Sequence, residues 1–502
     1  MVVSWRVIDL QVVNNSRYQD QGDAAHLRTV VIPAHRGMIS DRNGEPLAIS
    51  TPLASIWANP NEVLAVPEAL PALAKILGMD EKQLTKRLED RDDKEFVYLK
   101  RQVEPNVVRQ VKTLAIPGVN WRREFRRYYP AGEVTAHVLG FTNVDDKGQE
   151  GIELAYDDWL GGSQGSKRVL QDRRGHIIAD VKYIDDAKQG KDLKLSLDRR
   201  IQYLAYRSLK AAVRRQDAKG GAIVILDVNT GEVLAMVNQP AFNPNSRGHN
   251  KIASQRNRAV TDVFEPGSTL KPFIIAAALE SGVFSPKTVI DTNPGLFSVG
   301  RHSVRDTRNY GQINLTTILQ KSSNVGVSKV ALTLSKERLW QLLASAGFGS
   351  VTASGFPGEH SGVLNDYHRW RKIDHATLAF GYGISVTALQ LAQAYSVIAD
   401  HGVLKPVSLL PIDLPVTGRQ VMEASVADQL RNMLMTVVSD KGTAPLARIS
   451  GYTVAGKTGT VRKHKSGGYS KGKYNSLFVG MAPASNPRLV VVVIIDESSK
   501  DK

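Results

Sequence analysis

The sequence predicts an α+β protein built from two successive domains. At 502 residues, the chain is too long for one ordinary domain. Residues 191–502 contain β-rich runs and apolar segments with helical spacing, so we expect one large unit that mixes sheet and helix. Residues 1–190 are rich in turn signals and hold a locally basic segment at 122–130, and we expect them to form a separate N-terminal domain.

The clearest fold signal in the C-terminal domain is a β-hairpin. The apolar runs 222–226 and 233–237 flank the turn-forming residues 227–231, which is typical of two antiparallel strands. The basic, Gly-rich stretch 462–473 is predicted to be a loop. Further strands are expected at residues 452–461, 476–482 and 489–495, and helices at 198–213, 273–279, 316–332 and 387–398.

The N-terminal domain shows turns, short helical patterns and a basic segment. A turn at residues 41–44 separates two apolar pieces. Helices are expected near residues 67–77 and 82–88, and a short helical stretch is expected within 150–162. Positive charge and aromatic rings gather at residues 122–130, which we interpret as a solvated or docking face.

Composition excludes several classes of protein. Hydrophobic residues make up 42% and charged residues 23%, so the chain as a whole is globular rather than disordered. The lack of cysteine removes disulfide frameworks, thiolate zinc sites and cysteine nucleophiles. The longest apolar run, 489–495, has seven residues, whereas a membrane-spanning helix needs about 20. The net charge of +16 permits anionic partners: nucleic acid, acidic membrane surface or cell-wall polymer.

The first chemical motif places Ser268 and Lys271 three positions apart, on one face of a predicted helix. A serine hydroxyl needs a base to take its proton, and a desolvated lysine can act as that base. Ser268 is also of the residue type preferred at a helix N-cap, where the helix dipole adds positive charge. Taken alone, the spacing more often means a capping serine beside a surface lysine.

Two further motifs follow. Ser322-Ser323-Asn324 begins 54 residues after Ser268 and offers a second hydroxyl and an amide. Lys457-Thr458-Gly459-Thr460 begins 189 residues after Ser268, on a predicted strand. Its lysine and first threonine can bind a carboxylate, Gly459 leaves room for a ligand backbone, and the Thr460 N–H can donate to an oxyanion. Singly, these motifs are more often a helix cap and an ordinary strand glycine.

The three motifs together are far more specific than any one of them. S-x-x-K, S-x-N and K-T-G, in this order, form the constellation of penicillin-recognising serine acyltransferases. Flanking segments with the same resemblance are residues 264–272, 321–328, 379–383, 36–37, 41–44, 127–130 and 150–153. Over nearly its whole length the chain resembles the class B penicillin-binding proteins. It is most similar to their septal, cell-division peptidoglycan D,D-transpeptidases of Gram-negative bacteria.

The resemblance implies a fold for each domain. Residues 191–502 would form a penicillin-binding, serine β-lactamase-like transpeptidase domain with a central antiparallel sheet flanked by helices. Residues 1–190 would form an elongated, non-catalytic α/β pedestal of the dimerisation type. The resemblance also implies a single N-terminal anchor in the inner membrane, which no segment of this sequence matches, and a catalytic domain in the periplasm.

The resemblance also assigns roles to the catalytic residues. Ser268 would attack the penultimate D-alanine carbonyl of a stem peptide that ends in D-Ala-D-Ala, with Lys271 as its base. Ser322 would help pass the proton to the leaving amine, and Lys457 would shape the electrostatics beside it. Asn324 would hold the substrate. A second stem peptide would then resolve the acyl-enzyme and form a cross-link.

The remaining residues of the third motif are expected to bind substrate. Thr458 and Thr460 would face the substrate carboxylate, with Gly459 between them. The backbone N–H groups of Ser268 and Thr460 would form the oxyanion hole. No metal and no organic cofactor is implied. β-Lactam antibiotics would acylate Ser268 as mimics of the substrate terminus.

Partners and alternatives complete the prediction. Beyond stem peptides and β-lactams, the resemblance implies division-complex membrane proteins, including a glycan polymerase, and no nucleic acid. A D,D-carboxypeptidase or β-lactam hydrolase on the same fold would need a deacylating base, for which no convincing candidate is seen. A β-lactam sensor domain is disfavoured by the large N-terminal domain. A nucleic-acid-binding protein is suggested only by the charge, because no helix-turn-helix or stacking motif stands out.

Overall fold

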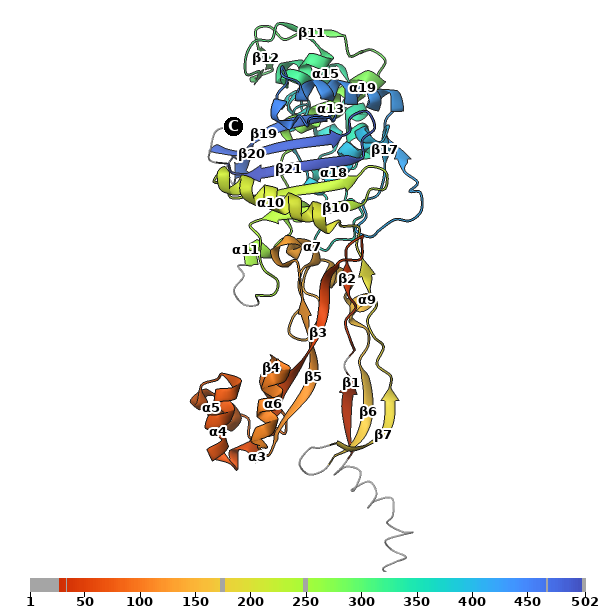
Figure 1. Ribbon diagram of the computed structural model, residues 1–502. Helices are drawn as coiled ribbons and strands as arrows, with labels where there is room; N and C mark the ends of the chain where they lie inside the picture. The colour runs from red at the N-terminus through yellow and green to blue at the C-terminus, as the bar shows by residue number, and fades with distance from the viewer. Residues whose placement is uncertain (1–26, 33, 172–176, 247–251, 466–467, 499–502) are drawn as a thin grey trace, which may run out of the picture.

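The computed structural model describes residues 27–32, 34–171, 177–246, 252–465 and 468–498. Figure 1 shows a rounded body formed mainly by the C-terminal residues, from which two slender N-terminal arms extend.

A five-stranded antiparallel sheet forms the centre of the rounded body. Its strand order is β10-β9-β21-β20-β19, so the sheet's first and last strands along the chain, β9 and β21, pair in its interior. The strands are β9 (Gly220–Asp227), β10 (Val233–Gln239), β19 (Ala455–Lys465), β20 (Gly468–Ala482) and β21 (Leu489–Asp496). The predicted hairpin is confirmed as β9 and β10.

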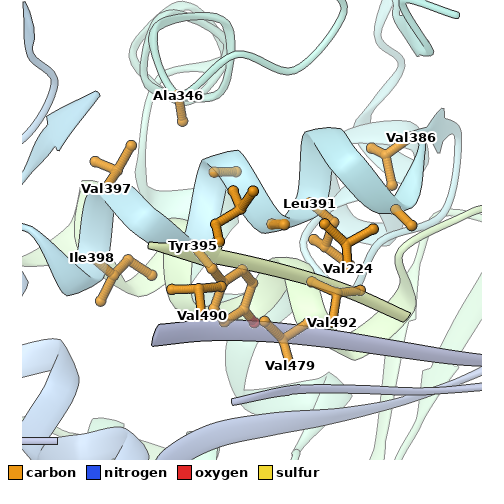
Figure 2. Close-up of a cluster of buried hydrophobic side chains, with 14 of the residues drawn as sticks. Val224, Ala346, Val386, Leu391, Tyr395, Val397, Ile398, Val479, Val490 and Val492 are labelled. Carbon is orange, nitrogen blue, oxygen red and sulfur yellow. The ribbon is translucent and has the colours of Figure 1, made fainter. Parts of the chain in front are cut away.

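Helices cover both faces of this sheet. α10 (Arg199–Arg215) packs on one face through its apolar side, against Ile223 and Val237 among others. α18 (Ala388–Ala399) lies against the other face, and every one of its 12 residues is buried. Figure 2 shows Tyr395 of α18 packed over Val490 and Val492 of the sheet. α18 is therefore an interior helix, buried on all sides.

Further elements surround α18 and the sheet. The helices are α11 (Ile252–Gln255), α12 (Arg258–Thr261), α13 (Lys271–Glu280), α14 (Leu315–Lys321), α15 (Asn324–Thr333), α16 (Lys336–Ser345), α17 (Lys372–Leu378) and α19 (Ala424–Met435). The short strands pair two by two: β11 (Val289–Asp291) with β14 (Gln312–Asn314), β12 (Leu296–Val299) with β13 (His302–Arg305), β15 (Val363–Leu364) with β16 (Ile384–Ser385), and β17 (Val403–Leu404) with β18 (Arg419–Gln420).

The predicted helix 316–332 is wrong as a single element. The structure has two helices, α14 and α15, separated at Ser322. Ser322 adopts a left-handed backbone conformation with φ of +59°, which an α-helix cannot continue through. The Ser323 hydroxyl then caps α15 by accepting from the Gly326 N–H.

The predicted loop at residues 462–473 is also wrong in most of its length. β19 continues to Lys465 and β20 begins at Gly468, with Arg462 paired to Tyr474. The basic, Gly-rich composition suggested a loop, but the antiparallel ladder satisfies the backbone of these residues. Ion pairs also offset the local positive charge: the Nζ of Lys463 lies 2.6 Å from a carboxylate oxygen of Asp496.

One N-terminal arm is a small sheet with its own hydrophobic core. β3 (Pro46–Ala58) pairs along its length with β5 (Val119–Tyr128), and β4 (Val97–Val103) pairs on its other side. Helices pack on one side of this sheet around buried leucines such as Leu73 and Leu84. These helices are α3 (Pro60–Leu64), α4 (Leu70–Leu77), α5 (Glu81–Glu89) and α6 (Pro105–Leu114). The predicted helices near 67–77 and 82–88 are thereby confirmed.

The second arm is a three-stranded antiparallel sheet in the order β1-β6-β7. Its strands are β1 (Leu27–Ile32), β6 (Gly165–Gln171) and β7 (Ile177–Asp185). Between the arms and the rounded body lie the short helices α7 (Ala136–Leu139), α8 (Gly151–Ala155) and α9 (Asp157–Gly161), and the paired strands β2 (Ile39–Ser40) and β8 (Leu193–Lys194).

A buried ion-pair network joins the segments at the base of the arms. The Nε atoms of Arg36 and Arg127 each lie within 2.7 Å of a carboxylate oxygen of Glu153. Arg36 also pairs with Asp157 at 2.6 Å. Three N-terminal segments singled out by the resemblance, at 36–37, 127–130 and 150–153, therefore meet at one point in space.

The turn at residues 41–44 connects the N-terminal region to the rounded body. The Asp41 carboxylate accepts from the Arg199 N–H at the start of α10, at 3.1 Å. Arg42 forms an ion pair with Glu232, beside β10, at 3.1 Å. No helix among the described residues is long and apolar enough to cross a membrane.

Candidate active site

Ser268 lies in a short 3₁₀ turn, Gly267–Leu270, that leads into α13. Gly267 has a φ of +57°, and a Cβ there would lie 2.3 Å from a methyl carbon of Val461 on β19. Only glycine fits this approach. Its N–H donates to the Gly381 carbonyl at 3.2 Å, so the turn is held between β19 and the segment around Gly381.

Ser268 does not act as the helix cap that its residue type suggests. Pro266 precedes the turn, and no side chain caps it. Ser268 is half-buried, and its hydroxyl makes no hydrogen bond to any other described residue. Because the hydroxyl is not used for capping, it remains available for chemistry.

Lys271 is fully buried, one turn after Ser268. Its Nζ donates to the Ser322 carbonyl at 2.5 Å, to the Ser322 hydroxyl at 3.1 Å and to the Asn324 side-chain oxygen at 2.7 Å. Burial, reinforced by the positive charge of Lys457, lowers the pKa of Lys271 well below its usual range, although Asp306 opposes the shift. The surroundings therefore favour a neutral amine.

Lys457 is also fully buried, and it approaches Ser322 from β19. Its Nζ donates to the Ser322 hydroxyl at 3.0 Å and to the Thr458 carbonyl at 3.1 Å. Burial lowers the pKa of Lys457 to about 7. The Ser322 hydroxyl thus lies between two buried lysine amines, and its own hydrogen stays available for donation.

The two threonines of the third predicted motif lie on the more open side of β19, whereas Lys457 and Gly459 are buried. Thr458 shares a 2.8 Å hydrogen bond with the hydroxyl of Thr443, and Thr460 is exposed. A Cβ on Gly459 would lie 3.0 Å from Thr269, so this glycine lets the nucleophile turn pack against the strand. That packing role was not foreseen from the sequence, which suggested only room for a ligand backbone.

The sequence analysis missed Asp306. Its carboxylate accepts from the Ser323 hydroxyl at 2.6 Å and from the N–H groups of Asn324 and Val325 at 2.5 and 3.0 Å. Asp306 is buried and precedes Ser323 by only 17 residues. It fixes the turn that presents Ser322 and Asn324 to Lys271, and no pattern in the sequence marks it.

The structure therefore brings the predicted site residues to one place. Lys271, Ser322, Asn324 and Lys457 form a continuous hydrogen-bonded cluster. Ser268 joins it through the turn that it shares with Lys271, and the strand segment 458–460 joins it by packing against that turn. The described residues contain no group of three or more His, Cys, Asp or Glu side chains placed to hold a metal ion.

Comparison with known proteins identifies the family of this chain. Residues 221–502 match the penicillin-binding protein transpeptidase domain, and residues 31–195 match the penicillin-binding protein dimerisation domain. The chain is a class B penicillin-binding protein. The mixed helices and antiparallel sheet described above agree with the α+β fold expected for both domains.

Relatives of this penicillin-binding protein match along its whole length. The probable peptidoglycan D,D-transpeptidase PbpC of Pseudomonas aeruginosa is 42% identical over 500 residues, covering 100% of this chain and 88% of PbpC. The peptidoglycan D,D-transpeptidase FtsI of Escherichia coli is 42% identical over 502 residues, covering 99% and 85%. Penicillin-binding protein 3 of Mycobacterium tuberculosis, solved in complex with aztreonam, matches with a TM-score of 0.73 and 28% identity, covering 94% and 92%.

Proposed function

We propose that this chain is a serine-type peptidoglycan D,D-transpeptidase that cross-links stem peptides through an acyl-enzyme on Ser268. The main observation behind the proposal is that two buried lysines, neither of them ion-paired with a carboxylate, lie around Ser322. This cluster includes Lys271, which is one turn from Ser268. The family and the named transpeptidase relatives support the same activity.

Acylation begins with proton transfer from Ser268 to Lys271. A neutral lysine has two N–H hydrogens and one lone pair. The Ser322 carbonyl and the Asn324 side-chain oxygen, its two shortest contacts, accept the two hydrogens. The lone pair then takes the Ser268 proton as the oxygen attacks the penultimate D-alanine carbonyl. The geometry around Lys271 therefore suits a neutral amine that acts as a base rather than a charged amine in an ion pair.

The terminal D-alanine leaves as an amine and needs a proton. Once Lys271 has taken the Ser268 proton, its third N–H can donate to the Ser322 hydroxyl, which also accepts from Lys457 and keeps its own hydrogen for donation. It can therefore donate to the departing nitrogen and be reprotonated from Lys271 or Lys457. In the second half-reaction the amine of another stem peptide attacks the ester. The same groups take the proton of this amine and pass it to the departing Ser268 oxygen, which restores the serine hydroxyl.

Residues on the open side of β19 would orient the substrate. We assign Thr458 and Thr460, with Gly459 between them, to the terminal carboxylate, and the N–H groups of Ser268 and Thr460 to the oxyanion. Asn324 holds the substrate amide from the opposite side. β-Lactams acylate Ser268 by the same attack, because their ring amide stands in for the D-Ala-D-Ala bond.

We also propose the cellular setting implied by the family. The chain would divide into a pedestal, residues 1–190, and a transpeptidase domain, residues 191–502. It would act in septal wall synthesis on the periplasmic side of the inner membrane, where stem peptides lie, with division-complex membrane proteins as partners. The similarity to FtsI of Escherichia coli supports this setting.

Intact-mass spectrometry after incubation with benzylpenicillin tests the proposal. A persistent adduct of one drug mass on the wild type, absent from Ser268→Ala, is the expected result. Rapid loss of the adduct with drug turnover would indicate that the chain is a β-lactam hydrolase rather than a transpeptidase. A folded wild type that forms no adduct would overturn the assignment of Ser268.

A further inference from the structure

The outward face of helix α10 has an unusual composition. The 17 residues of the whole helix include five arginines and one lysine but no aspartate or glutamate. Its inward face packs on the sheet through Ala205, Tyr206 and Leu209. The helix runs along the outside of the rounded body (Figure 1), beside β10. The catalytic lysine Lys457 lies on β19, at the opposite edge of the sheet.

The charged residues of this face recur at heptad spacing. Arg200, Arg207 and Arg214 lie seven residues apart, so they follow one stripe of the helix at intervals of about 10 Å. Between the first two lie Tyr203 and Leu204, which are 53% and 57% exposed. The face therefore alternates guanidinium groups with apolar side chains, opposite the buried side of the helix.

Half of the six cationic residues of α10 are ion-paired within the chain: Arg199 with Glu45, Arg200 with Asp198 and Lys210 with Glu133. Arg207, Arg214 and Arg215 form no ion pair or hydrogen bond with any other described residue. Arg200 is paired with Asp198, yet 81% of its side chain remains exposed. Unpaired arginines around exposed apolar side chains are typical of binding surfaces, where aromatic residues and arginine are enriched.

Helix stability does not account for this face. Arg214 and Arg215 lie in the last turn, where they complement the helix dipole. Arg199 and Arg200 lie in the first turn, where positive charge opposes the dipole, and Arg207 lies at the centre, where the dipole has no effect. Exposed Tyr203 and Leu204 add nothing to the core.

We propose that this outward face of α10 docks an acidic amphipathic α-helix of a partner protein. Carboxylates at heptad spacing on the partner would meet Arg207 and Arg214, and its apolar stripe would cover Tyr203 and Leu204. A heptad stripe selects a helix because a partner helix repeats its own side chains with the same period.

A membrane surface fits this face less well than a helix does. Helices that bind lipid surfaces insert a broad apolar face into the headgroup region. The broad apolar face of α10 is already buried against the sheet through Ala205, Tyr206 and Leu209. Only Tyr203 and Leu204 remain outside as large apolar groups, and arginines flank them.

The test uses the full chain and a fluorescein-labelled synthetic helix. The probe has three heptads, about 21 residues, with leucine along one stripe and glutamate at the flanking positions. Fluorescence anisotropy measures its binding at low and at high salt. The double variant Arg207→Glu/Arg214→Glu is expected to bind about tenfold or more weakly, because two attractions become repulsions.

The matched control is Lys82→Glu/Lys86→Glu on α5, which makes the same change of charge on another exposed helix. It should bind the probe within about twofold of the wild type. Tyr203→Ser/Leu204→Ser should also weaken binding of this probe, but not the weak binding of poly-glutamate, which lacks an apolar stripe. Adduct formation with benzylpenicillin, measured in parallel, reports that each variant is folded and is expected to be unchanged.

Three results would overturn the proposal. The α10 double variant could bind the probe as tightly as the wild type does. The α10 double variant and the α5 control variant could lose binding equally, which would show that only the net charge of the chain matters. Vesicles of anionic lipid could bind through the same arginines while the acidic helix does not, which would make the face a membrane contact.

Discussion

Two regions of this protein bury positive charge, and they treat it in opposite ways. At the base of the arms, the buried guanidinium groups of Arg36 and Arg127 share the carboxylate of Glu153. In the proposed catalytic cluster, the buried amines of Lys271 and Lys457 have neutral oxygens as their hydrogen-bond acceptors.

The pKa values follow from this difference. For Arg36, burial lowers the pKa, but Glu153 and Asp157 more than offset it and the pKa rises. For Lys271, burial and Lys457 together lower the pKa strongly. Paired charge therefore serves as structure, whereas buried charge without a carboxylate partner becomes a reactive neutral amine. Each prediction below breaks or sharpens this comparison.

Replacing the amine proposed as the catalytic base should give the largest effect. Lys271→Met removes this amine while keeping an unbranched side chain in the buried site. The second-order rate of benzylpenicillin acylation should fall about a thousandfold. Thermal unfolding should show equal or higher stability, because an amine that is costly to bury has been removed. A large loss of stability together with the loss of rate would show that Lys271 is a structural cation like Arg36.

Removing the shared carboxylate should act on stability instead. Glu153→Gln leaves the buried Arg127 without a carboxylate partner and leaves Arg36 with the half-exposed Asp157 alone. The free energy of unfolding should fall by about 3–5 kcal/mol in a denaturant titration. Acylation of the folded fraction should keep its rate, since Glu153 lies outside the catalytic cluster. A drop in that rate with stability unchanged would contradict the separation of the two regions.

Stability should rise with pH because of Lys457. Below about pH 7 both the folded and unfolded states carry its proton, and the folded state bears the full cost of the buried charge. Above that pH and up to the ordinary lysine pKa near 10.5, only the unfolded state keeps the proton, so stability increases with pH. From about pH 7 to about pH 9 this contribution is about 2 kcal/mol. Lys457→Met should flatten the rise by that amount, measured by denaturant titration at each pH.

The outer member of the ion network should matter least. Asp157 pairs with Arg36, but 34% of its side chain is exposed to solvent. The Gly148 N–H donates to the Asp157 carboxylate at 2.8 Å, and Asp157→Asn keeps an oxygen that can accept this hydrogen bond. The loss of stability should therefore stay below about 1 kcal/mol. A loss as large as that of Glu153→Gln would mean that the network acts as one unit.

Much of the fold could be predicted from local patterns. The β9–β10 hairpin and α10 have the expected periodicities over their full length. The helix predicted at 316–332 failed because Ser322 must leave the helix to meet both lysines, a tertiary demand that overrides apolar spacing. The strands beyond Arg462 were missed because their composition resembles a loop, while the sheet ladder and pairing with Asp496 hold them.

The site residues that belong to a sequence motif could be predicted, and those outside the motifs could not. The order and spacing of the three motifs marked Ser268, Lys271 and Lys457 for one cluster. Asp306 carries no motif, and its role depends on the turn after β13 lying beside Ser323. Likewise, the contact that requires glycine at Gly267 comes from Val461, which is far away in sequence.

The most direct test of this account is the acylation rate of the wild type as a function of pH. With a neutral Lys271 as base, the rate of benzylpenicillin acylation should reach its plateau before the pH at which an ordinary lysine loses its proton. Its acid limb should lie well below the ordinary lysine pKa of about 10.4. A rate that keeps rising up to about pH 10 would mean that Lys271 stays protonated, and it would contradict the account.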